Sequence, residues 1–182
     1  MKKLFANIFL SAVALGFASV APAATDAAKA TYKAAKESAS ATYKTERAKC
    51  DAMSGNPKDV CIAEAKAAEK RSKAEAEAQY KNTPKAHMNA RIAATDADYA
   101  VAKEKCNAQS GNSKDVCIKE AKAAQTKAVV DAKSSQKIGE VKSEAKEDKG
   151  DADYKVAIEK CDALAGPAKD ACVASAKSKY GK

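Results

Sequence analysis

The 182-residue sequence predicts an all-α protein of three disulfide-clamped antiparallel helical hairpins, joined by helical or flexible linkers into an elongated molecule. Two observations support this prediction: a composition rich in alanine and lysine, and a cysteine-containing unit that occurs three times. Alanine has the highest helix propensity, but burying its methyl group contributes little at about 25 cal/mol per Å². After residue 24 the chain contains no phenylalanine and a single leucine, Leu164. Large apolar side chains therefore fall below the roughly 20% that is typical of globular domains, which disfavours a large single-core enzyme domain.

The N-terminal segment predicts export. Two lysines precede an apolar run over residues 4–20, and Ala21-Pro22-Ala23 supplies the small residues that signal peptidase accepts. We therefore expect residues 1–23 to be a signal peptide, cleaved before Ala24. The alternative is an uncleaved membrane anchor, for which an apolar run of about 17 residues is at the lower limit of length. Cleavage removes two of the 33 basic residues and leaves 31 against 24 acidic ones, a formal charge of +7 with no remaining membrane span.

A unit with constant spacing occurs three times after this segment. Each unit has a tyrosine seven residues before its first cysteine, a glycine five residues after that cysteine, and a second cysteine six residues after the glycine. The units recur every 55 or 56 residues, which indicates a repeated structural element. The cysteine pairs are Cys50 and Cys61, Cys106 and Cys117, and Cys161 and Cys172, and the glycines are Gly55, Gly111 and Gly166.

Each unit predicts two helices joined by a tight turn. Glycine can adopt the left-handed conformation that closes a helix C-terminus, so we expect the first helix of each unit to end at its glycine. The following asparagine, Asn56 or Asn112, is expected to cap the second helix. Pro57 then falls at the first helical position, where its missing N–H costs nothing. The third unit has Pro167 in place of the asparagine, so we expect its turn to be the least well capped.

The two cysteines of a unit lie on either side of the turn, each about one and a half helical turns away from it. Antiparallel helices bring such positions level, within the roughly 7 Å between Cα atoms that a disulfide requires. We therefore predict a disulfide within each unit, and closing a loop of about 12 residues stabilises it by roughly 3 kcal/mol. Alanine and tyrosine share the cysteine-bearing faces, and tyrosine is expected to supply most of the apolar mass between the helices.

Two other roles for the cysteines fit the sequence less well. A metal site requires thiolates or imidazoles at short spacing, whereas His87 is the single histidine and lies between units. A redox site favours Cys-x-x-Cys, whereas ten residues separate the cysteines here. We therefore predict no metal, cofactor or catalytic residues, and structural disulfides of the kind that form in oxidising compartments.

Local signals divide the rest of the chain. Pro84 disfavours helix at the residue before it, so the segment Asn82-Thr83-Pro84 is expected to end a helix. Thr95-Asp96 offers a fresh N-cap, Ser134-Ser135 and Gly139 are expected to weaken the helix after the second unit, and Lys149-Gly150-Asp151 is expected to separate it from the third. The predicted organisation after the signal peptide is hairpin 1 over residues 24–82, hairpin 2 over 83–133, a linker over 134–150, and hairpin 3 over 151–182.

The unit Tyr-Lys…Lys-Cys-Asp-Ala…Gly…Lys-Asp-x-Cys, together with the leader and the Ala/Lys-rich helices, resembles small periplasmic proteins of Gram-negative bacteria. Such proteins are labelled hypothetical or TolA-like cell envelope proteins. The resemblance implies a periplasmic location and a role in the cell envelope. In addition, the stretch Ala28 to Arg47 is similar to the 11-residue repeats of late-embryogenesis-abundant protectants.

Three functional hypotheses follow. The first is a non-enzymatic structural or interaction protein, periplasmic or secreted, whose partner is an unknown envelope protein or an anionic envelope surface and whose Ala-rich faces could self-associate. The second is a stress protectant, which works while largely disordered. The third is a weak binder of anionic envelope polymers through counterion release. Acidic residues interleave the lysines and the chain has three arginines, so no specific nucleic acid is expected. Nor does the sequence carry a nucleophile–base pair or a phosphate-binding loop that would indicate an enzyme.

Overall fold

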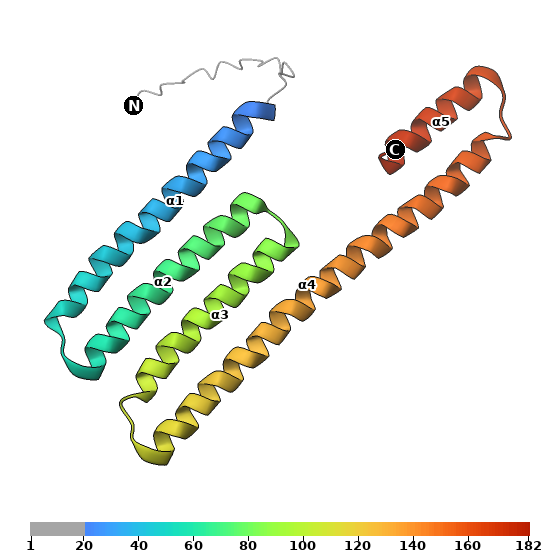
Figure 1. Ribbon diagram of the computed structural model, residues 1–182. Coiled ribbons are helices and arrows are strands. Elements are labelled where there is room, and N and C mark those ends of the chain that lie inside the picture. The colour runs from blue at the N-terminus through green and yellow to red at the C-terminus, as the bar shows by residue number, and fades with distance from the viewer. Residues whose placement is uncertain (1–20) are drawn as a thin grey trace, which may run out of the picture.

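The computed structural model describes residues 21–182, and within them the chain is all-helical, as predicted (Figure 1). The apolar run over residues 4–20, on which the predicted signal peptide depends, lies outside the described residues. The elements in chain order are α1 (Ala21–Lys49), the short 3₁₀ helix η1 (Cys50–Ala52), α2 (Gly55–Lys81), α3 (Pro84–Cys106), α4 (Gly111–Cys161) and α5 (Gly166–Tyr180).

The helices form an open row instead of a closed bundle. Helices α1, α2, α3 and the first half of α4 lie side by side in antiparallel order, and α5 folds back along the far end of α4 (Figure 1). Among residues 21–182, α1 makes no contact with α3, and α2 makes none with α4. Each helix therefore packs only against its neighbours in the sequence, and α1 and α4 form the two edges of the row.

The interior is built from alanine. Of the 14 buried hydrophobic residues in the described part of the chain, ten are alanines, three are cysteines and one is Val101. Between α2 and α3 the packed residues follow one spacing on both helices, in steps of four, seven and four residues. A step of 11 residues returns to the same side of a helix, so each set lines one face. The sets are Ala63, Ala67, Ala74 and Ala78 on α2, and Ala86, Ala90, Ala97 and Val101 on α3.

No tyrosine of the described chain is buried, and the buried residues are alanine, cysteine and valine, so the expectation that tyrosine supplies most of the apolar mass between the helices is wrong. Tyr32 stacks on Tyr80 with 4.8 Å between ring centroids, at the end of hairpin 1 away from its disulfide. Tyr154 meets Tyr180 edge-on at 6.1 Å in hairpin 3. The small alanine side chains allow the helix backbones to approach closely, and this close approach leaves the large rings at the margins.

Helix α4 runs without interruption through residues 134–150, so the predicted linker is helical and the expected break is absent. A glycine inside a helix costs about 1 kcal/mol relative to alanine, and the surrounding lysine, glutamate and alanine residues favour the helix enough to offset Gly139 and Gly150. Hairpins 2 and 3 consequently share one helix of 51 residues. At 1.5 Å per residue this helix is about 75 Å long.

The start of α3 corrects a second expectation. Helix α2 ends at Lys81, as predicted, and Asn82 adopts a left-handed conformation with φ of 44°. Thr83 then caps α3, because its Oγ1 accepts a hydrogen bond from the Ala86 N–H at 3.1 Å. Thr95, the expected N-cap, lies inside α3, where its hydroxyl donates to the Arg91 carbonyl at 2.9 Å. The proline at the first helical position, which needs no N–H, makes residues 83–84 the stronger start signal.

Candidate functional site: the disulfide-clamped turns

Three disulfides close the three units, and the predicted pairing within each unit is confirmed. The Cα–Cα distances are 5.7 Å for Cys50–Cys61, 5.7 Å for Cys106–Cys117 and 5.6 Å for Cys161–Cys172. The first cysteine of each pair is almost completely buried, with exposed fractions of 0%, 1% and 1% in chain order. We call the segments between paired cysteines, residues 50–61, 106–117 and 161–172, the first, second and third clamped turns.

The glycines adopt positive φ, as predicted, but they begin the second helix instead of ending the first. The first helix of each unit ends at its first cysteine or one residue before it, and each glycine is the first residue of α2, α4 or α5. The φ angles of Gly55, Gly111 and Gly166 are 61°, 53° and 57°. The left-handed glycine therefore reverses the chain on entry into the second helix.

The expected asparagine caps are not formed. The N-cap positions are Ser54, Ser110 and Ala165, and none of these residues makes a side-chain capping hydrogen bond. The third turn is therefore no less well capped than the others. Pro57 is the third residue of α2 and not the first. Since the first four N–H groups of a helix have no intrahelical partner, proline at this position still costs no hydrogen bond.

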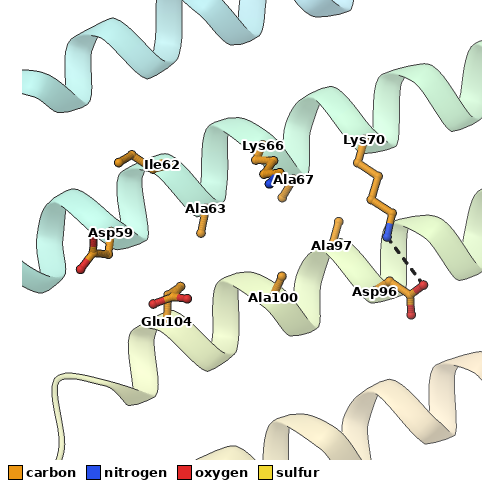
Figure 2. Close-up of a pocket in the computed structure, with 10 residues that line it drawn as sticks. All are labelled: Asp59, Ile62, Ala63, Lys66, Ala67, Lys70, Asp96, Ala97, Ala100 and Glu104. Atoms are coloured by element: carbon orange, nitrogen blue, oxygen red, sulfur yellow. Dashed lines mark ion pairs between the residues drawn. The ribbon is translucent and has the colours of Figure 1, made fainter.

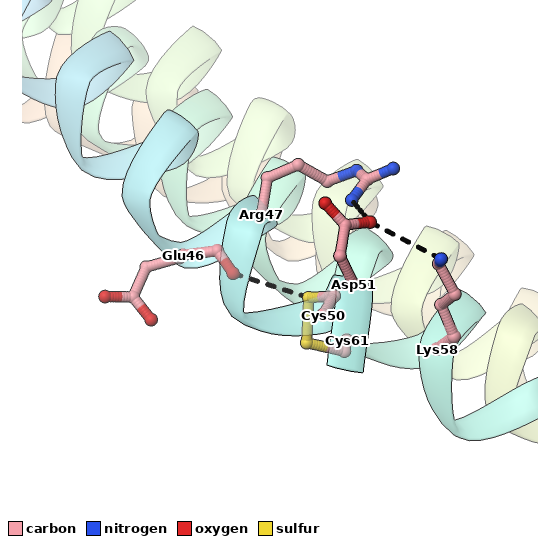
Figure 3. Close-up of polar contacts among 6 residues, drawn as sticks. All are labelled: Glu46, Arg47, Cys50, Asp51, Lys58 and Cys61. Atoms are coloured by element: carbon pink, nitrogen blue, oxygen red, sulfur yellow. Dashed lines mark hydrogen bonds and ion pairs between the residues drawn. A yellow bond between two sulfur atoms is a disulfide. The ribbon is translucent and has the colours of Figure 1, made fainter. Parts of the chain in front are cut away.

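The first and third clamped turns each contain an ion pair between an aspartate and a lysine at equivalent positions of the repeat. The Asp51 carboxylate accepts from Arg47 at 2.6 Å and lies 3.4 Å from the Lys58 ammonium, next to the Cys50–Cys61 bridge (Figure 3). Hydrogen bonds from Arg47 and then Lys58 lower the pKa of Asp51 below its ordinary value. In the third turn, Lys169 lies 3.0 Å from Asp162.

The second clamped turn differs at this position. Asn107 replaces the aspartate, and its amide donates to the Glu104 carboxylate at 2.8 Å. The turns also differ in the side chain at the third position after the first cysteine. Met53 in the first turn is 47% exposed and Leu164 in the third is 44% exposed, whereas the second turn has the polar Gln109. The first and third turns thus combine an ion pair with an exposed apolar side chain.

The first and second clamped turns lie together at one end of the row, and the third lies at the opposite end of α4 (Figure 1). Two contacts hold the first pair of turns in register. The Asn56 amide donates to the Glu104 carbonyl at 2.7 Å, and Lys105 lies 2.8 Å from Glu64. Neither contact can be predicted from the sequence, because the partners are far apart in the chain and charged residues occur on almost every helix face.

A pocket between α2 and α3 is a second candidate site (Figure 2). Four alanines and Ile62 line its floor, and five charged residues surround them. Across the pocket, Lys70 on α2 lies 3.7 Å from Asp96 on α3. None of the ten lining residues carries a hydroxyl, thiol or imidazole group. These residues belong to the alanine interface and its flanking ion pairs, so we assign the pocket to helix packing.

No protein-family model, curated protein or solved structure matches this chain. In the part of the chain that the structure describes, no helix is both long enough and apolar enough to span a membrane. Disulfides form and persist in oxidising compartments outside the cytoplasm. The structure is therefore that of a disulfide-rich, all-helical protein consistent with an extracytoplasmic location.

Proposed function

We propose that this protein is a non-enzymatic structural protein of the periplasm that spaces or tethers components of the cell envelope. The observation that supports this most strongly is the separation of the clamped turns. Met53 and Leu164, the exposed apolar residues of the first and third turns, lie at opposite ends of the molecule, with the length of α4 between them. A protein with an exposed contact residue at each end can hold two partners apart.

The construction of each end favours such a role. A disulfide fixes the two helices, and the ion pair between the aspartate and the lysine orders the turn that presents the apolar side chain. A side chain that is already ordered loses less entropy on binding. The resemblance to TolA-like envelope proteins, carried by the cysteine units, agrees with a location where these disulfides persist.

The test is site-specific photo-crosslinking in the intact envelope of the cells that make the protein. A photoreactive amino acid replaces Met53 in one variant, Leu164 in a second, and Ala28, an exposed residue of α1, in a matched control. We expect discrete products at Met53 and Leu164, with different partners at the two ends, and none at Ala28. Equal and diffuse labelling at all three positions would contradict the proposal, and products that contain only anionic polymer would favour the polymer-binding alternative.

A further inference from the structure

The outer face of α4 has the pattern of a helix-packing face but no partner among residues 21–182. We define this face by Val130, Ser134, Ile138, Val141 and Ala145, all of which are exposed. Val130, Ser134, Val141 and Ala145 are separated by steps of four, seven and four residues, as are the packed residues in the interface between α2 and α3. The exposed fractions of Val130, Ile138 and Val141 are 54%, 55% and 55%.

Helices α3 and α5 both pack on the opposite side of α4. Ala132 is buried where α4 contacts α3, and Tyr154 contacts Tyr180 of α5. Two residues turn a helix by about 200°, which places Val130 nearly opposite Ala132. Between the segments covered by α3 and α5, residues 137–149 are all exposed. An isolated helix of that length is only marginally stable in water, so a partner on this face would support the least protected part of α4.

Charges beside the outer face are arranged in blocks of one sign. Lys133 and Lys137 are four residues apart, and the acidic residues Glu140, Glu144 and Asp148, which begin three residues after Lys137, are also four residues apart from one another. Like charges at this spacing destabilise a helix. No ion pair within residues 21–182 engages any of these five side chains.

At Lys29–Lys33 and Lys66–Lys70 the same spacing joins like charges, but at several other places it joins opposite charges in ion pairs. Examples are Lys33 with Glu37, Glu69 with Lys73, and Glu77 with Lys81. In α4 a block of basic residues, Lys133 and Lys137, is followed by a block of acidic residues, Glu140, Glu144 and Asp148. This order makes the flank of α4 between the outer face and the groove to α3, which Glu140 and Glu144 line together with Arg91, positive in its first half and negative in its second.

We propose that a second copy of this chain packs antiparallel on the outer face of α4, around a two-fold axis near Ile138 and Val141. An antiparallel copy reverses the order of the blocks. It places Lys133 opposite Glu144 and Asp148 of the second copy, and Lys137 opposite Glu140 and Glu144 of the second copy. The same patch then serves both subunits, as a two-fold interface requires.

The interface between α2 and α3 provides the precedent inside the molecule. Those helices are antiparallel, use the same residue spacing, and are flanked by ion pairs between them at Lys70–Asp96 and Lys105–Glu64. The proposed dimer repeats this arrangement with valine and isoleucine in place of several alanines. The proposal concerns self-association and does not depend on the envelope role proposed above.

Reversing each charge block in turn tests the orientation. One variant carries Lys133→Glu and Lys137→Glu, which makes the flank uniformly acidic. A second carries Glu140→Lys, Glu144→Lys and Asp148→Lys, which makes it uniformly basic. Sedimentation equilibrium of the exported, oxidised protein should give a mass that rises towards two chains with concentration. Each variant alone should remain at one chain, and an equimolar mixture of the two should recover the two-chain mass.

A matched control carries Lys29→Glu and Lys44→Glu, two exposed lysines of α1, and should self-associate like the unmodified protein. Far-UV circular dichroism checks that every variant keeps its helices, and variants that lose helix are replaced by the single substitution Lys137→Glu and its counterpart Glu144→Lys. A protein that stays at one chain at every concentration would overturn the proposal. So would variants that dimerise unchanged, or a mixture that fails to recover the dimer.

Discussion

Lys169 lies across the third clamped turn from Asp162, with 3.0 Å between Nζ and Oδ1, and Lys58 and Asp51 occupy the same two repeat positions in the first turn at 3.4 Å. The second unit has Asn107 at this position. The pair is thus present in the two turns with an apolar residue three positions after the first cysteine, and absent from the second turn, which has Gln109 there and exposes Val116 to 44%. This correlation links the electrostatics of each end to its exposed surface.

The Asp51 pair predicts a pH-dependent contribution to stability. Because hydrogen bonds from Arg47 and Lys58 lower the pKa of Asp51 below its ordinary value of 3.8, the stabilisation is fully present above that pH. It is lost as pH falls through the lowered pKa of the folded protein. We expect Asp51→Asn to lower the Tm slightly at neutral pH, since the pair is exposed, and to lower it progressively less as the solution becomes more acidic than 3.8.

The measurement is thermal unfolding by circular dichroism over a series of pH values. Asp153→Asn serves as the control, because Asp153 is exposed on α4 and forms no ion pair within the described residues. A Tm difference for Asp51→Asn that grows in acid would show that the pair does not stabilise the folded turn.

Alanine substitution of Gly55 and of Gly139 should change stability in opposite directions. At Gly55, with φ of 61°, an added Cβ meets nothing within 4 Å, so the cost of Gly55→Ala is conformational and amounts to about 1 kcal/mol. Gly139 has a helical conformation and equally open surroundings, so Gly139→Ala should stabilise by about 1 kcal/mol. Urea unfolding of the oxidised protein measures both. Equal effects of the two substitutions would mean that the backbone of the turn is not as described.

Loss of the third disulfide should unfold α5. This helix has 15 residues and, among residues 21–182, packs only against α4, so the double substitution Cys161→Ser, Cys172→Ser removes roughly 3 kcal/mol from a thin interface. Hydrogen exchange of the amides of residues 166–180 should become fast, with a fall in helix content. Low helicity in both the oxidised and the reduced protein would favour the protectant alternative instead.

The matched variant is Cys106→Ser, Cys117→Ser. Helix α3 also packs against α2, so hairpin 2 keeps a second interface when its own bridge is removed. We expect smaller changes in helix content and in amide exchange. If both double variants lost the same helix content, the bridges and not the alanine interfaces would determine the stability of every hairpin.

The alanine interface should tolerate no enlargement. Ala97 is buried on α3 against Ala67 and Val101, and Ala97→Leu forces α2 and α3 apart at an expected cost of about 1–3 kcal/mol. Ala48→Leu, on an exposed position of α1, should leave the urea midpoint almost unchanged. A neutral Ala97→Leu would indicate a looser interface than the close approach described here.

The sequence was sufficient to predict the all-helical class and the disulfide pairing, because the spacing between Cys50 and Cys61 places the two residues level only across an antiparallel hairpin. It was misleading about helix boundaries. Gly150 and Ser134 have low helix propensity, yet the surrounding residues carry α4 through both positions. The helix propensity lost at a single glycine is about as large as the propensity that a few favourable neighbours provide. Propensity alone therefore does not show whether a helix is interrupted at such a glycine.

The contacts between units could not be predicted. Lys105 pairs with Glu64, but each lysine in the chain has several acidic residues within helical reach. Selecting the partner requires knowing that the first two clamped turns lie at the same end of the row. The order of packing, in which α3 contacts α2 and α4 but α1 contacts neither α3 nor α4, is a property of the folded chain that no local pattern encodes.

The continuity of α4 is the central claim, since it alone holds the third clamped turn away from the other two. The most direct test is single-molecule energy transfer between dyes attached to unnatural amino acids at Gln109 and Leu164, which flank the two ends of α4. A continuous helix predicts one narrow distribution of dye-to-dye distances centred at about 75 Å. A broad distribution at shorter distances, restored to the longer one by Gly139→Ala with Gly150→Ala, would place a hinge in residues 134–150 and contradict the rigid spacer.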